Sequence, residues 1–283
     1  MTKKLIQVAA KMNILFTKAQ AAGNDFIIVD NTARSLSGKI DDLSRFAKFV
    51  CRRKYSIGAD GLLVLEDSAE FDFRMRIFNP DGSEVAMCGN GIRVSALYAQ
   101  NMKWCGDSMK IETAAGLLRA SVNGEAVKVK MVPPENIELN RNIGAGNTVM
   151  NVHALNTGVP HAVHFVDNVE KYPVTEMGAK VRYHKVFRPE GTNADFVQVC
   201  GKSTIKVRTY ERGVEDETLA CGTGVVASAI VSHLVNGMQA PVKAVTKSGD
   251  VLVVYFKKGH DAFSDVYLEG EAHIVFNGGV DYV

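Results

Sequence analysis

The sequence has no uninterrupted apolar run of about 18 residues, the length that would indicate a membrane-spanning helix. The opening stretch MTKKLIQVAAKMN begins with a charged head, but Gln7 and Lys11 interrupt an apolar segment too short for a signal peptide. Neither sign of charge dominates, with 33 Lys plus Arg against 31 Asp plus Glu, and no block forms a charged tail. These absences argue against a nucleic-acid surface and a membrane-binding patch. We expect a soluble, cytoplasmic protein that acts on a small molecule.

Cysteine is scarce and widely spaced. The five cysteines are an odd number and show no CxxC or zinc-ribbon spacing. A disulfide framework is not expected in a reducing compartment. No Schiff-base lysine motif or metal-ligand cluster is evident, so the sequence permits chemistry without a metal or cofactor. Any special cysteine chemistry must come from the surroundings of individual thiols.

Two cysteines occur in related motifs. Residues 88–93 read CGNGIR and residues 221–224 read CGTG, and each motif stands at the head of an apolar run. Three further pairs of segments recur in the same order at nearly the same offset. The matched segments are 76–79 with 208–211, 58–64 with 191–197, and 23–26 with 158–161. This order predicts an internal duplication, with chance similarity of glycine-rich turns as the alternative.

The remaining patterns favour strands around two helices. Residues 126–132 and 204–210 alternate with period two, and residues 251–256 form a short apolar run. Residues 225–235 are apolar or small nearly all round, which is typical of a helix buried on every side. Helix 92–102 is similar, although Arg93 and Gln100 predict that one edge of it is exposed to solvent.

The expected fold class is therefore α+β. Two pseudo-symmetric domains arise from the duplication, each with strands that enclose one central helix. Pro133 and Pro134 mark the crossing between the halves, because neither residue continues a central strand. We expect an N-terminal extension (1–11), a first half (12–132) joined by the C-terminal strand 275–283, and a second half (133–274).

The two CGxG motifs suggest proton chemistry. Asn90 and Thr223 are good N-cap residues, which would leave each cysteine just outside a helix start. The free N–H groups and helix dipole there can bind a carboxylate, and the glycines allow close approach. The same field lowers a thiol pKa from its free value of about 8.5. Opposed thiols could invert a stereocentre, one removing the α-proton and the other returning a proton from the opposite face.

The plainer interpretation is that both cysteines fill space beneath helix starts, as buried free cysteines often do. Recurrence in matched positions of a duplicated chain favours the functional interpretation. Cys51, Cys105 and Cys200 have no such context, and we expect them to be core or surface filler.

The sequence resembles the diaminopimelate epimerase family from about Met12 onward. The matching segments are GNDFIIVD (23–30), GADGLLVLE (58–66), FNPDGSEVAMCGNGIR (78–93), PEGTNADFVQV (189–199) and YERGVEDETLACGTG (210–224). The resemblance implies two similar domains, each a strand-rich barrel-like shell around a central helix, with the active site in the cleft between them. It also implies interconversion of LL- and meso-diaminopimelate without pyridoxal phosphate or metal, in lysine and peptidoglycan precursor biosynthesis. A homodimer is what the family suggests.

The resemblance also assigns residues. Cys88 and Cys221 become the acid/base pair, with His161 and Glu211 beside the thiols to assist proton movement. Substrate contacts fall on Asn24, Asn79, Gly89, Asn90, Asn193, Glu211, Arg212, Gly222 and Thr223. Without the family, His161 after a proline is also typical of a capped turn. Glu211 could likewise be a surface partner of Arg212.

The sequence departs from the family pattern in three places, and several alternative functions stay open. Val159 stands where many members have asparagine, Gly61 where some have a polar side chain, and residues 1–11 precede the usual beginning. Proline racemase and hydroxyproline epimerase share the fold and the thiols, but usually have a histidine after the first Cys-Gly. A phenazine-biosynthesis-like isomerase lacks the cysteine pair. A redox switch and a non-catalytic binding protein are further alternatives.

Overall fold

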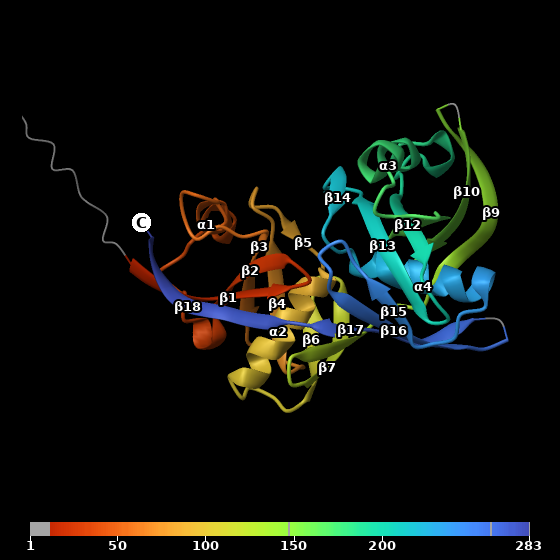
Figure 1. Cartoon of the computed structure of the whole chain (residues 1–283). Coiled ribbons are helices and arrows are strands. Elements are labelled where there is room, and N and C mark those ends of the chain that lie inside the picture. Colours follow the sequence, from red (N-terminus) through yellow and green to blue (C-terminus); the bar gives the residue numbers. More distant parts are fainter. Residues whose placement is uncertain (1–11, 147, 261, 283) are drawn as a thin grey trace, which may run out of the picture.

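The computed structural model describes residues 12–146, 148–260 and 262–282; the expected N-terminal extension lies outside them. The first half contains β1 (Met12–Ala21), β2 (Asn24–Asp30), η1 (Thr32–Arg34), α1 (Leu43–Val50), β3 (Gly61–Glu66), β4 (Phe73–Phe78), β5 (Glu84–Val85), α2 (Gly89–Asn101), β6 (Ser108–Thr113), β7 (Gly116–Asn123) and β8 (Ala126–Lys130). The second half contains β9 (Glu135–Ala145), β10 (Thr148–Asn156), β11 (Pro160–Phe165), α3 (Val174–Arg182), η2 (Lys185–Phe187), β12 (Asn193–Val199), β13 (Thr204–Glu211), β14 (Asp216–Thr218), α4 (Gly222–Asn236), β15 (Val242–Val245), β16 (Val251–Lys258) and β17 (Phe263–Glu271), and the last strand of the chain is β18 (His273–Tyr282). Figure 1 shows the two strand-rich halves side by side.

The two halves repeat one topology, which confirms the predicted duplication. In the first half, β2 and β3 run parallel across α1, with Phe26 opposite Gly61. In the second half, β11 and β12 run parallel across α3, with His161 opposite Asn193. Parallel neighbours require a crossover, and a helix supplies it in both halves. Phe26 therefore corresponds to His161, and Gly61 to Asn193.

A duplicated ion pair strengthens this correspondence. Arg76 donates from Nε and Nη2 to the Glu84 carboxylate, at 2.8 Å in both cases. Arg208 grips Glu217 in the same two-pronged way, with its Nη2 at 2.7 Å from Oε2. The arginines lie on β4 and β13. The glutamates lie on the short strands β5 and β14, which directly precede the cysteine helices.

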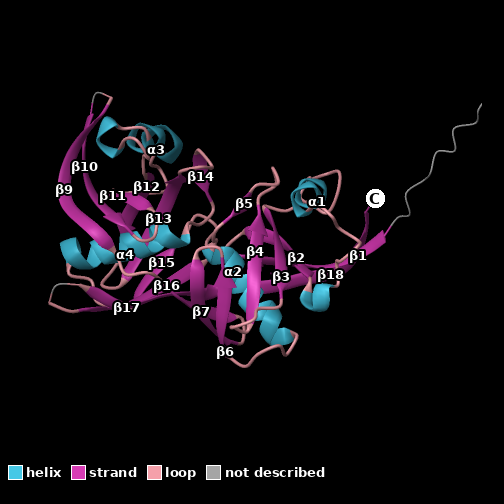
Figure 2. Ribbon diagram, turned by 180° about the vertical axis from the view of Figure 1, so that it is seen from behind, coloured by secondary structure: helices cyan, strands magenta, loops and turns pink. Residues whose placement is uncertain are grey.

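Helices α2 and α4 form the centres of the halves, surrounded by strands (Figure 2). Every residue from 224 to 232 is buried, as the apolar pattern of α4 predicted. The helix ends at Gly237, whose φ of 69° is the left-handed conformation that glycine adopts readily. Among the described residues, no helix is long and apolar enough to span a membrane.

The prediction that one edge of α2 is exposed to solvent is wrong at Arg93. Its side chain is completely buried. Nη2 donates to Asn90 Oδ1 at 2.6 Å, and the guanidinium lies over Gly270 of β17, where a Cβ would come within 3.5 Å of Arg93 Nε. An arginine from the first half is thus buried in ordinary contact with a glycine of the second, while the atom closest to such a Cβ is Leu252 Cδ2, at 2.3 Å. Sequence periodicity alone could not show this contact between distant segments.

The strand pairings show where the chain passes from one half to the other. β9 follows β8 in sequence but pairs with β10, whereas β18 pairs with β1, with Met12 opposite Tyr282. β8 and β17 also pair with each other. Figure 1 shows β18 (blue) alongside β1 (red). These pairings support our proposal that the halves divide near residues 132 and 133 and that the C-terminal strand joins the first half.

Candidate active site

The two candidate catalytic thiols lie at the starts of the central helices. Cys88 is the N-cap of α2 and Cys221 is the N-cap of α4, both with extended backbones. The sequence prediction that Asn90 and Thr223 would be the caps was wrong by two residues, because the cysteines themselves adopt the cap conformation. As a result, the thiols rather than an amide or hydroxyl face the first free N–H groups of each helix. These are the N–H groups of Asn90 and Gly91 for Cys88, and of Gly224 for Cys221.

Burial dominates the acidity of both thiols. It raises the pKa of Cys88, and the helix N–H groups and the charge of Arg93 only partly oppose it. Burial also raises the pKa of Cys221 well above its usual value, with the carboxylates of Glu211 and Asp195 adding to the effect. The sequence predicted a lowered pKa at the helix starts. The N–H groups act in that direction, but desolvation of the thiolate outweighs them.

Glu211 connects the two thiols electrostatically. Its negative charge raises the pKa of both Cys88 and Cys221, so this second-half carboxylate acts on a thiol in each half. Burial raises the pKa of Glu211 itself, although the Thr218 hydroxyl and His161 oppose the shift. Both thiols therefore lie within electrostatic range of the same carboxylate.

His161 reaches Cys221 through a hydroxyl group. His161 Nδ1 lies 2.7 Å from Asp195 Oδ2, and Nε2 lies 2.9 Å from Thr223 Oγ1. Thr223 Oγ1 is in turn 3.5 Å from Cys221 Sγ. Asp195 also accepts a 2.7 Å bond from Thr209 Oγ1. A continuous polar chain therefore runs from a buried carboxylate to the second thiol.

Cys88 has a different neighbour. The first-half position that corresponds to His161 is Phe26, so the duplicated histidine is absent there. The buried Arg93 supplies positive charge instead. Burial lowers the pKa of Arg93 to about 10, which leaves it a cation at neutral pH, and its Nε and Nη1 find no hydrogen-bond partner within the described chain.

Several polar groups could receive a substrate with amino and carboxylate groups. Asn24 Oδ1 is buried without a hydrogen-bond partner among the described residues, which suits an acceptor for an ammonium group. Arg212 donates from Nη1 to Glu190 O at 3.4 Å, and its fork can bind a carboxylate. Asn79 donates to Ser83 Oγ at 3.0 Å.

Asn193 is more committed to the protein. Its Nδ2 donates to Pro160 O at 3.0 Å, and its Oδ1 accepts from the Arg212 N–H at 2.8 Å. These bonds fix the turn before His161 and the backbone at Arg212. Direct contact between Asn193 and substrate stays a prediction, as do the contacts of the glycines beside the two thiols.

The other three cysteines lie elsewhere. Cys51 is buried in the core around α1, and burial raises its pKa to about 12. Cys105 is half-buried, and Cys200 is exposed at the end of β12.

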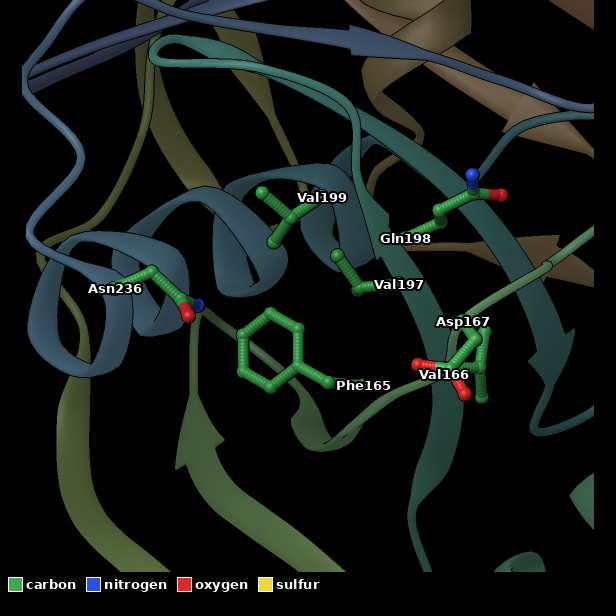
Figure 3. A pocket seen from close by; sticks show the side chains of 7 residues that line it. All are labelled: Phe165, Val166, Asp167, Val197, Gln198, Val199 and Asn236. Atoms are coloured by element: carbon green, nitrogen blue, oxygen red, sulfur yellow. The ribbon is translucent and has the colours of Figure 1, made fainter.

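Other hollows and ligand-like groups are separate from the thiols. Figure 3 shows a cavity of about 290 Å³ lined by Phe165, Val197 and Asn236 among others. Asn236 ends α4, so the cavity lies roughly 20 Å along the helix from Cys221. Glu125, Glu271 and His273 group their ligand atoms within 4.8 Å at the β8–β17 edge, where both glutamates are exposed. Among the described residues, we assign no metal or cofactor ligand at the thiols.

Comparison with known proteins decides the family. The model of the diaminopimelate epimerase family matches residues 16–137 and 153–275. The chain belongs to this family. A diaminopimelate epimerase of Aquifex aeolicus is 42% identical over 273 residues, covering 93% of this chain and 96% of the relative. Another from Archaeoglobus fulgidus is 39% identical over 279 residues, covering 94% and 96%.

Solved structures show that the fold extends beyond diaminopimelate epimerases. A phenazine biosynthesis protein of the PhzF family from Bacillus anthracis aligns with a TM-score of 0.71 at 17% identity, covering 95% of this chain and 99% of that one. A hydroxyproline epimerase from Agrobacterium vitis aligns with a TM-score of 0.70 at 14% identity, covering 95% and 92%. At these identities the likeness concerns the fold alone.

Two members of the site escaped sequence reasoning. Asp195 is an acidic residue inside the apolar strand ADFV, an unusual position that is the sequence signal for its importance. Arg93 was assigned to an edge exposed to solvent. Both are fully buried, and the charge of each acts on one of the thiols.

Proposed function

We propose that this chain interconverts LL- and meso-diaminopimelate by moving an α-proton between substrate and the thiols of Cys88 and Cys221. The observation that carries the proposal is the placement of two thiols as N-caps of equivalent central helices in a duplicated fold. One thiolate removes the α-proton from one face, and the opposing thiol delivers its proton to the other face. This scheme requires neither metal nor pyridoxal phosphate.

The helix starts also bind the reacting amino acid. Its α-carboxylate accepts from free N–H groups at residues 89–91 and 222–224, where the helix dipoles favour an anion. Glycines at 89 and 222 leave the main chain accessible. Asn24 and Asn79 contact the polar groups of the substrate, and Arg212 grips a carboxylate. The negative charge that develops at the α-carbon is then close to two helix N-termini.

His161 and Glu211 set the proton affinity of the thiols. His161 reaches Cys221 through the Thr223 hydroxyl, and the charge of Glu211 acts on both thiols. We propose a cytoplasmic enzyme of lysine and peptidoglycan precursor synthesis, where a reducing environment keeps both thiols free. A homodimer stays the expectation that the family provides.

The test is substrate choice by the purified, reduced protein without added cofactor. We expect conversion of LL- into meso-diaminopimelate, and no racemisation of L-proline or epimerisation of trans-4-hydroxy-L-proline. Turnover of a proline substrate with none of diaminopimelate would reassign the activity within the same fold. Binding of diaminopimelate by calorimetry without turnover of any of them would indicate a non-catalytic descendant.

A further inference from the structure

Asp195 is a fully buried carboxylate that the two-thiol scheme leaves without a role. It lies in the interior of β12 and accepts a hydrogen bond from Thr209 on the neighbouring strand β13. Its Oδ1 packs directly against the start of α4, because a Cβ added at Gly224 would come within 2.3 Å of it. The positive end of the helix dipole is a favourable place for a carboxylate.

This carboxylate determines how His161 is used. A carboxylate only accepts hydrogen bonds, so the imidazole N–H that faces Asp195 is on Nδ1. The other nitrogen, Nε2, then presents its lone pair to Thr223 Oγ1 at 2.9 Å. The hydroxyl donates to Nε2 and remains able to accept from the Cys221 thiol 3.5 Å away.

We propose that Asp195 is a positioning residue for a proton relay that runs from Cys221 through Thr223 to His161. The inference rests on the proposed function. The Cys221 S–H bond breaks as its proton passes to Thr223 Oγ1, while the proton of Oγ1 passes to Nε2 of His161. The products are a thiolate, an unchanged hydroxyl and an imidazolium beside Asp195. The reverse sequence restores the thiol, and no oxidant or further reactant takes part.

The surroundings of Cys221 explain why it needs such a relay. Facing it are the carboxylates of Glu211 on β13 and Asp195 on β12, together with the Gly224 N–H of α4. Two carboxylates oppose a thiolate, whereas an imidazolium beside it compensates them. Asp195 and Glu211 are also the charged groups around His161. Cys88 has the Arg93 cation instead.

Substitution of Asp195 by asparagine separates two physical pictures by the sign of their effect. If Asp195 acted on Cys221 only as a nearby negative charge, its removal would make the thiolate easier to form. If Asp195 holds His161 as a proton acceptor, its removal makes the thiolate harder to form. The measurement is the rate of alkylation by iodoacetamide in the absence of substrate, resolved for each cysteine by mass spectrometry between pH 6 and 10.

We expect Asp195→Asn to slow alkylation of Cys221 at pH 7 roughly tenfold, about the effect of one charge-assisted hydrogen bond. Cys88 should change by less than about twofold, the accuracy of such a rate comparison. His161→Gln should slow Cys221 similarly and decides the question if Asp195→Asn does not fold. Its control is His153→Gln, since His153 is a buried histidine on β10 whose Nδ1 accepts from Asn140 N.

Faster or unchanged alkylation of Cys221 in Asp195→Asn, or in His161→Gln if only that variant folds, overturns the relay. Failure of the proposed function gives a different result. In that case the wild-type protein does not convert diaminopimelate, whatever the alkylation profiles of its thiols. A wild-type enzyme that converts diaminopimelate, combined with unchanged Cys221 reactivity in the variants, removes the relay alone.

Discussion

Phe26 and His161 occupy equivalent positions in the two halves, each paired with the first residue of the following parallel strand. The duplication thus preserved two helix starts with a thiol on each, but it did not preserve their neighbours. One thiol has a hydroxyl and an imidazole nearby, and the other has a buried guanidinium. The two thiols are therefore chemically distinct, as suits a reaction whose substrate and product differ in configuration.

Removal of either catalytic thiol should abolish epimerisation. Cys88→Ala and Cys221→Ala each leave one face of the α-carbon without a proton donor or acceptor, so we expect kcat to fall by about 10³-fold or more. Cys51→Ala is the control, because this cysteine lies in the separate core around α1. The measurement is formation of meso-diaminopimelate. Near wild-type turnover in either thiol variant would refute the two-thiol scheme.

Removal of Arg93 should lower the reactivity of Cys88 without lowering the stability of the protein. Arg93→Met removes the cation that lowers the pKa of Cys88, so alkylation of Cys88 at pH 7 should slow several-fold, while Arg93→Lys should retain most of the rate. Two guanidinium nitrogens find no hydrogen-bond partner among the described residues, so the apolar variant should be no less stable than wild type. Thermal unfolding and alkylation measure the two effects. A strongly lowered Tm with unchanged Cys88 reactivity would indicate a purely structural residue.

Glu211 should make stability depend on pH. Burial raises its pKa above the ordinary 4.5, so the folded state binds the proton more tightly than the unfolded state does. The protein therefore loses stability as pH rises from about 4.5 through the raised pKa. Glu211→Gln should increase Tm at pH 8 relative to wild type, and the gain should vanish near pH 4. A gain that is largest at low pH would contradict this sign.

The duplicated ion pairs provide a matched comparison. Glu217 is 5% exposed and also bonds Lys247, whereas Glu84 is 37% exposed. Glu217→Gln should therefore destabilise the protein by about 2–4 kcal/mol, because it leaves the Arg208 charge poorly compensated in a half-buried place. Glu84→Gln should cost under about 1 kcal/mol. Urea unfolding at pH 7 compares them. Equal losses would show that burial does not control the strength of these pairs.

The pH dependence of both pairs has a defined direction. The pKa values of Glu84 and Glu217 are both lowered. The hydrogen bond from Arg76 is the main cause for Glu84. For Glu217, burial raises the pKa, but the bonds from Arg208 and Lys247 outweigh it. Lowered carboxyl pKa values stabilise the fold at neutral pH, and this contribution disappears as pH falls through the folded pKa. The difference between wild type and Glu217→Gln should therefore shrink toward pH 3.

The sequence predicted the duplication, the central helices and the position of the two thiols at the helix starts. Each of these features depends on short residue patterns that recur along the chain. The pattern around Cys88 and Cys221 repeats, and the apolar run of 225–235 has no polar face. What it could not predict depends on contacts between distant segments. Arg93 of the first half is buried against Gly270 of the second, and Asp195 meets its partners only where β11, β12 and α4 converge. The cap position was missed because cysteine is not a usual N-cap residue.

The most direct test of the account is conversion of LL-diaminopimelate in D₂O by the reduced protein, stopped at a few per cent conversion. Both thiols exchange their protons with solvent, so the thiol that protonates the product should deliver deuterium. We predict meso product with one α-deuterium at the inverted centre, while the recovered LL substrate remains essentially unlabelled. Meso product that retains α-protium, or substrate labelled as rapidly as product, would contradict proton transfer between two opposed thiols.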